Sequence, residues 1–127
     1  MNKFSLTLIA CFAISPLAFG QDSGNAAAGK KLAESWQCTL CHGPDGNGNN
    51  GIAKLEISDV HRIPRISAQP QAYFIKSMHD YKSGKRSYDE MKVIVEQLSD
   101  TDIRNLAAWY GSQTPRTHAT YYDDPNN

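Results

Sequence analysis

The residues best suited to chemistry are two cysteines and a histidine within five positions, Cys38-Thr39-Leu40-Cys41-His42. C-x-x-C-H is the pattern at which haem c is attached. Each cysteine can add across one vinyl group of a porphyrin, and the adjacent histidine can then place a neutral imidazole nitrogen on iron. The spacing therefore predicts one haem c bound covalently through Cys38 and Cys41, with His42 at the iron.

Two other uses of a cysteine pair are open at this point. A redox disulfide of the C-x-x-C type usually lies beside a strand–helix–strand pattern, which this sequence lacks. A zinc site needs two further ligands at regular spacing. The remaining histidines are scattered, at positions 61, 79 and 118, and there is no second cysteine pair. Haem is therefore the favoured interpretation.

Residues 1–20 have the features of a secretory signal peptide. Lys3 supplies a positive charge, residues 4–19 are mostly apolar, and Ala18-Phe19-Gly20 offers small residues for cleavage after about Gly20. The apolar run is too short and too interrupted to predict a stable membrane span. We therefore expect a periplasmic protein from which this segment has been removed.

The cysteines and the charge agree with export. Cys11 lies in the leader, where a lipoprotein processing site is a less favoured alternative, so the mature chain keeps only Cys38 and Cys41. Thirteen Lys and Arg balance thirteen Asp and Glu, which gives no support for a nucleic-acid partner. The length suffices for one domain, expected over 21–113, with a flexible tail over 114–127.

Four stretches of the chain show helical periodicity, at 26–37, 70–83, 87–98 and 99–111. The buried faces should be formed by Phe74, Met78 and Tyr81; by Met91, Ile94, Val95 and Leu98; and by Ile103, Leu106, Ala107 and Tyr110. Ser87 to Glu90 matches a capping box for the third helix, and Ser99 to Asp102 matches a weaker one for the fourth. With no convincing strand, the sequence predicts an all-α domain.

Two stretches lack this periodicity. Gly43–Gly51 is a dense run of turn-forming residues without the Lys-Ser/Thr or the preceding strand of a phosphate-binding loop, so we expect it to wrap one edge of the haem. Ile52–Ile66 mixes apolar and charged residues without a period and is expected to be irregular.

Taken in order, these motifs resemble those of small bacterial class I c-type cytochromes. The resemblance covers about Gly29 to Gln113. It rests on Cys38-x-x-Cys41-His42-Gly43-x-Asp45-Gly46, Ile63-Pro64-x-Ile66-x-x-Gln69, Tyr73, Gly84-Lys85-Arg86, a methionine seven residues before Leu98-Ser99-Asp100, and a last helix reading Leu-Ala-Ala-Trp-Tyr. Two departures are a long interval between His42 and Pro64, and Ala68 where the family often has glycine.

The resemblance implies a cytochrome c fold, four to five helices around one haem. It also implies His42 as the proximal iron ligand and Met91 as the distal ligand. Core packing explains Met78, which remains an alternative to Met91, as do a distal histidine and an open site. The carbonyl of Pro64 is expected to accept a hydrogen bond from the other ring nitrogen of His42. The first and last helices should cross closely at Gly29.

The same resemblance implies a periplasmic electron carrier, with no catalytic residues and with redox proteins as transient partners. The alternatives are a haem c subunit of a periplasmic dehydrogenase or oxidase complex, a homodimer, and a ligand sensor with an open distal site. A basic cluster around the 70–83 helix is either a docking patch or a solvated helix face; it consists of Lys76, Lys82, Lys85 and Arg86.

Overall fold

The computed structural model describes residues 23–48 and 63–116. Within these ranges the chain forms five helices and no strand, which confirms the all-α prediction. They are α1 (Ala26–Ser35), α2 (Cys38–His42), α3 (Gln71–Lys82), α4 (Asp89–Glu96) and α5 (Asp100–Gly111). The predicted signal peptide, most of the irregular segment and most of the predicted tail lie outside the described residues.

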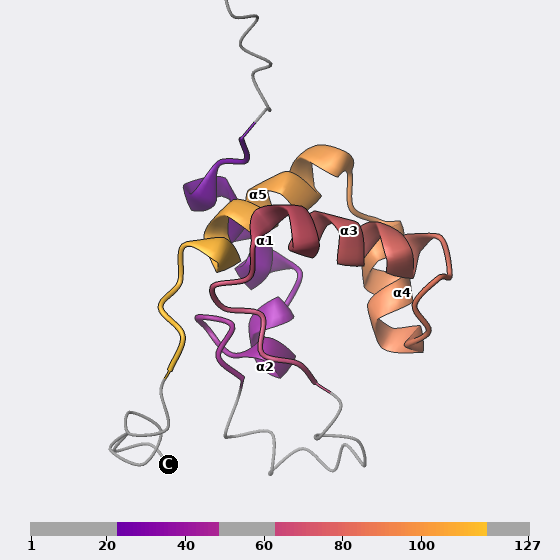
Figure 1. Cartoon of the computed structure of the whole chain (residues 1–127), viewed down its shortest axis with the longest axis horizontal. Coiled ribbons are helices and arrows are strands. Elements are labelled where there is room, and N and C mark those ends of the chain that lie inside the picture. The colour runs from indigo at the N-terminus through magenta and orange to yellow at the C-terminus, as the bar shows by residue number, and fades with distance from the viewer. Residues whose placement is uncertain (1–22, 49–62, 117–127) are drawn as a thin grey trace, which may run out of the picture.

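Helices α1 and α5, from the two ends of the described chain, cross each other (Figure 1). A Cβ atom on Gly29 would lie 2.0 Å from the carbonyl oxygen of Asn105 and 2.8 Å from the Cβ of Trp109. The side chain of Asn105 also accepts a 2.7 Å hydrogen bond from the backbone N–H of Asn25. Glycine at position 29 therefore lets the two backbones approach as closely as the sequence predicts.

The N-caps of α1 and α5 are the residues predicted from the sequence, whereas the N-cap of α4 is not the predicted one. Asn25 caps α1 by accepting from the N–H of Ala28, and Ser99 forms a complete capping box with Asp102 at the start of α5. The capping box expected at Ser87 is wrong. Helix α4 begins one residue later, so Tyr88 is its N-cap, and the Tyr88 side chain makes no capping hydrogen bond.

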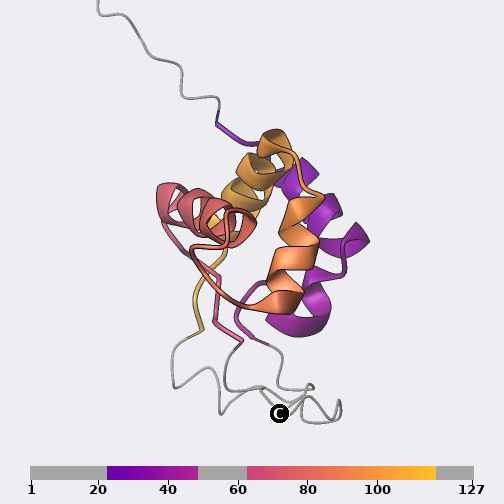
Figure 2. The ribbon, with the colours of Figure 1, turned by 90° about the vertical axis from the view of Figure 1, so that its right-hand side faces the viewer.

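The core forms where α1, α3, α4 and α5 meet, and it contains the apolar faces expected from periodicity. The rings of Phe74 and Tyr110 stack there with centroids 5.9 Å apart. Figure 2 shows α3 on one side of the molecule and α4 with α2 on the other. This arrangement places the C-x-x-C-H helix and the Met91 helix around the same space.

Candidate haem site

A cavity of about 400 Å³ lies between the helices and the loop that follows Ile63. Protein interiors contain few voids larger than a water molecule, so an apolar cavity of this size is a space for a ligand. Its walls include residues from α2, α3, α4, α5 and the 63–69 segment: Cys38, Cys41, His42, Pro64, Ile66, Phe74, Met78, Met91, Ile94, Leu98, Leu106 and Tyr110. The structure thus brings every site residue predicted from the sequence to one cavity.

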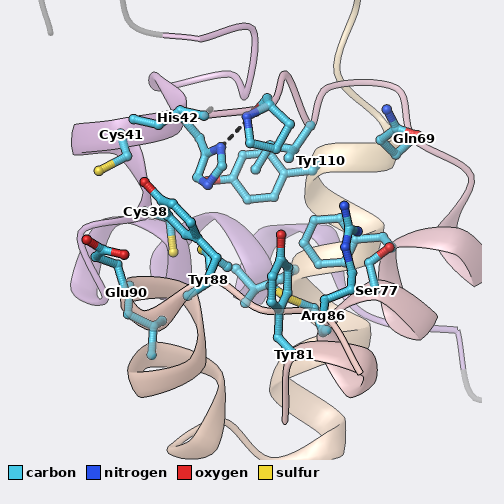
Figure 3. A pocket seen from close by; sticks show the side chains of 18 of the residues that line it. Cys38, Cys41, His42, Gln69, Ser77, Tyr81, Arg86, Tyr88, Glu90 and Tyr110 are labelled. Carbon is cyan, nitrogen blue, oxygen red and sulfur yellow. Dashed lines mark hydrogen bonds between the residues drawn. The ribbon is translucent and has the colours of Figure 1, made fainter. Parts of the chain in front are cut away.

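The two cysteines reach the cavity from the short helix α2. Gln37 has a left-handed backbone (φ 56°) and turns the chain between α1 and α2. Both thiols are free and half-buried, and Figure 3 shows both side chains at the same end of the cavity. Burial raises the pKa of the Cys38 thiol, opposed by a backbone hydrogen bond. The intervening Leu40 is exposed, whereas both cysteines line the cavity.

His42 is the last residue of α2 and is 7% exposed. Its Nδ1 lies 3.0 Å from the carbonyl oxygen of Pro64 (Figure 3), which is the contact implied by the resemblance. A carbonyl only accepts, so Nδ1 carries the proton and donates it, and Nε2 keeps a lone pair for a metal. Burial lowers the pKa of His42, and the bond to Pro64 opposes this shift. The result is a neutral, oriented imidazole.

Met91 is the third residue of α4 and lines the cavity while remaining partly exposed. Met78, in the middle of α3, is 8% exposed and belongs to the core, but it also lines the cavity. The sequence favoured core packing for Met78 and kept it as an alternative distal ligand, and the structure places it both in the core and at the cavity. Helix periodicity identifies a buried face without showing whether a side chain or a ligand covers it.

Tyr110 is a cavity residue whose role the sequence did not indicate. Its hydroxyl is buried and has no hydrogen-bond partner among the described residues. Burial raises the pKa of Tyr110 well above its ordinary value. An unpaired buried hydroxyl is costly in a closed core, so its presence at this wall fits a space that a ligand completes.

The alternatives to haem find little support in the described residues. In 23–48 and 63–116 no three His, Cys, Asp or Glu side chains are grouped closely enough to hold a metal ion. Of the scattered histidines, His79 lies on α3 and faces Asp100 at 3.9 Å, and the other two fall outside the described ranges. A bare zinc ion therefore lacks a ligand set there, whereas an apolar cavity beside two thiols and an imidazole fits haem c.

The four residues of the basic cluster differ in what they contact. Lys76 pairs with Asp80, and Lys82 donates a 2.6 Å hydrogen bond to the carbonyl of Leu98. Arg86 lines the cavity with its guanidinium carbon 4.9 Å from the centroid of the Tyr81 ring. Lys85 is exposed. The four residues therefore do not form one uniform patch, and Lys82 stabilises the end of the α4 segment.

At the other end of the cavity from the cysteines, Figure 3 shows Arg86 with Ser77 and Gln69. The vinyl and propionate groups of haem occupy opposite edges of the porphyrin. Residues able to bind carboxylates therefore lie where the propionates would be.

None of the helices in the described ranges has both the length and the apolar character needed to cross a bilayer.

A family model described as "Cytochrome c" matches residues 26–113. The chain is 36% identical over 113 residues to cytochrome c4 of Pseudomonas aeruginosa, covering 89% of this chain and 49% of that protein. It is 33% identical over 94 residues to cytochrome c-554(548) of Halomonas halodenitrificans, covering 72% of this chain and 99% of that protein. A crystal structure of cytochrome c4 from Pseudomonas stutzeri matches with a TM-score of 0.56 and 28% identity, covering 72% of this chain and 52% of that one.

The relatives differ in the share of their length that this chain covers. The chain spans about half the length of the cytochrome c4 relatives, but nearly all of cytochrome c-554(548). The match to the solved structure, together with the helices above, confirms the cytochrome c fold.

Proposed function

Because the chain belongs to the cytochrome c family and its cofactor is haem c bound through Cys38 and Cys41, we propose that it is a periplasmic electron carrier with His42 and Met91 as axial ligands. The observation that carries the proposal is the shared apolar cavity. Two thiols, an oriented neutral imidazole and a methionine line it, and they come from α2 and α4. When bound, haem c supplies one-electron redox chemistry.

The chain's own residues have distinct tasks in this function. The carbonyl of Pro64 accepts a hydrogen bond from Nδ1–H of His42, which fixes the ring and strengthens Nε2 as a ligand. A thioether sulfur from Met91 favours Fe(II) over Fe(III) and raises the reduction potential. The apolar walls exclude water, and burial in a low-dielectric space disfavours the more highly charged oxidised centre. If His42 and Met91 held both axial positions, none would be left for a substrate, which is why we propose a carrier and no enzyme.

The test is the visible spectrum of the purified holoprotein in oxidised, reduced and carbon monoxide-treated states. The proposal expects sharp reduced bands that survive denaturation, because the haem is covalent, and no rapid binding of carbon monoxide, because both axial sites are filled. Rapid binding of carbon monoxide by the wild type would contradict Met91 ligation and favour a sensor.

Two methionine variants sharpen the assignment. Met91→Leu should open the distal site, so carbon monoxide binds and the reduction potential falls. Met78→Leu is the matched control, since it makes the same substitution at a second methionine of the same cavity. It should keep the wild-type spectrum. The assignment is wrong if the two variants exchange these behaviours.

A free carrier should bind its partners weakly, and electrostatics should affect the rate of encounter more than the affinity. Lys85→Glu tests the exposed part of the basic cluster without removing the Lys82–Leu98 hydrogen bond.

Gel filtration of a native extract distinguishes a free carrier from a homodimer and from a subunit of a larger complex. A monomer supports the free carrier, whereas a larger species indicates a homodimer or a subunit of a dehydrogenase complex. Mass spectrometry of the mature N-terminus checks cleavage after about Gly20.

A further inference from the structure

We propose that Asn47 is a positioning residue for the axial histidine, because it connects the loop after His42, the segment after Pro64 and the chain beyond α5. This inference rests on the proposed function only in taking His42 as an iron ligand. It concerns His42, which lines the cavity, and the 43–48 loop that follows it in sequence, and it involves a side chain to which neither the C-x-x-C-H motif nor helix periodicity assigns a role.

The amide of Asn47 makes three hydrogen bonds to two other segments. Its Oδ1 accepts from the hydroxyl of Ser67 at 2.7 Å and from the backbone N–H of Arg116 at 2.7 Å. Its Nδ2 donates to the carbonyl of Thr114 at 2.9 Å. The backbone N–H of Asn47 donates to Oδ1 of Asp45 at 3.0 Å, which fixes the turn that carries the side chain. One amide thus uses both its acceptor and its donor to join three parts of the chain.

The segment that Asn47 contacts through Ser67 is the one that holds His42. The carbonyl of Gly46 accepts from the N–H groups of Ile66 and Ser67, at 2.8 and 2.9 Å. Pro64 lies two residues before Ile66, and its carbonyl accepts from Nδ1 of His42. Ser67 is 4% exposed, so its hydroxyl depends on Asn47 for a partner away from water. Any movement of this segment therefore moves the acceptor of the His42 hydrogen bond.

Residues 114–116, which follow α5, contact both the 43–48 loop and the segment that contains Pro64. The guanidinium of Arg65 donates to the carbonyl of Arg116 at 2.9 Å, and Arg116 lies 3.7 Å from the carboxylate of Asp45. The ion pair is partly exposed and contributes little by itself. The backbone groups of Thr114 and Arg116 are bonded to Asn47, so these residues at the start of the predicted tail lie against the His42 loop.

The physical consequence follows from the tautomer of His42. A firm Nδ1–H to carbonyl bond strengthens the imidazole as a donor to iron, and mutation of such outer partners typically costs 10–100-fold in metal affinity or activity. Removing the Asn47 amide frees the 64–67 segment and weakens that bond. The imidazole then donates less to Fe(III), and the equilibrium shifts toward Fe(II).

The experiment compares Asn47→Ala with Asn105→Ala in the holoprotein. Asn105 is the matched control, because its amide also joins distant segments, but at the crossing of α1 and α5. At a fixed applied potential, Asn47→Ala should raise the ratio of reduced to oxidised protein about tenfold, which is about 59 mV for a one-electron couple. By NMR, the Nδ1 proton of His42 should also exchange faster with solvent. Asn105→Ala should change neither quantity.

Ser67→Ala provides a second variant that removes only one of the three bonds, in case Asn47→Ala does not accumulate as holoprotein. It should shift both readouts in the same direction by a smaller amount. The inference is overturned if Asn47→Ala, or Ser67→Ala in its place, leaves both readouts at wild-type values, or if Asn105→Ala moves them equally. The carbon monoxide response of the wild type is measured separately, so failure of this inference is distinguishable from failure of the proposed function.

Discussion

The His42 side and the Met91 side of the cavity are built from different kinds of contact. On the His42 side, backbone groups and one half-buried amide join loops that are far apart in sequence, through Gly46, Asn47 and Pro64. A ring of such bonds resists displacement because moving one member breaks several bonds together. His42 is therefore held by its surroundings as well as by its own helix.

The Met91 side is formed by one short helix. Helix α4 has eight residues, no side-chain cap at Tyr88, and an exposed Val93 (61%) in its middle. A helix of this length has little stability of its own, so α4 depends on packing against its neighbours. Its anchors are Val95 and Leu98 in the core and the hydrogen bond from Lys82 to Leu98. From this difference we predict that Met91, the proposed distal ligand, dissociates from iron more readily than His42.

The largest expected effect comes from adding a methyl group on the His42 side. Gly46 has φ +76°, and a Cβ atom there would lie 2.6 Å from Cδ1 of Tyr110. Gly46→Ala should lower the free energy of unfolding by about 3 kcal/mol, from overpacking together with the left-handed backbone. Chemical denaturation of the holoprotein measures this change.

Gly48→Ala is the control for that experiment. Gly48 also has a positive φ, of +94°, but a Cβ atom there meets no heavy atom within 4 Å. It should cost only the left-handed penalty of about 1 kcal/mol. Equal losses for the two variants would show that close packing at Gly46 is unimportant.

The next prediction measures the difference between the two sides directly. In mild denaturant, carbon monoxide should bind the reduced wild type before global unfolding, because α4 opens alone and releases Met91. The free energy of this opening should lie about 2 kcal/mol or more below that of global unfolding. Coincident transitions for carbon monoxide binding and for far-ultraviolet circular dichroism would contradict the comparison.

A smaller effect is expected from strengthening α4. Val93→Ala should raise the free energy of the carbon monoxide-detected opening by about 0.5 kcal/mol, because alanine has the higher helix propensity and this position is exposed. Ala27→Val, the reverse change at an exposed position of α1, should not change that opening. If both variants change it equally, α4 is not an independent unit.

An effect of similar size is expected at Ala68, which has a left-handed backbone (φ 54°) and donates its N–H to the carbonyl of Tyr110 at 2.8 Å. Ala68→Gly removes the Cβ strain but increases the entropy of the unfolded chain, so the net gain should be about 0.5 kcal/mol. A thermal melt of the holoprotein detects this gain, and a loss of stability would show that Ala68 is not strained. This is the position at which the family often has glycine.

How much of the fold and of the haem site could be predicted from the sequence depended on how far apart in sequence the interacting residues lie. The helical faces containing Val95 and Ile103, and the C-x-x-C-H motif, are local patterns, and the structure contains them as expected. The capping box at Ser87 was wrong because α4 begins at Asp89, which puts Tyr88 at the N-cap and leaves Ser87 one residue outside it. The role of Asn47 had no local signal, because its partners lie 20 and about 70 positions away.

The crossing of α1 and α5 also orders events in time. Asn25 and Asn105 are 80 positions apart, so this contact requires nearly all of the described chain. Contacts of such long range form only after the intervening chain is available, because closing the loop costs entropy first. While the chain emerges, Cys38 and Cys41 precede the helix that completes their core. We therefore expect the attachment motif to stay accessible for haem attachment until α5 has packed against α1.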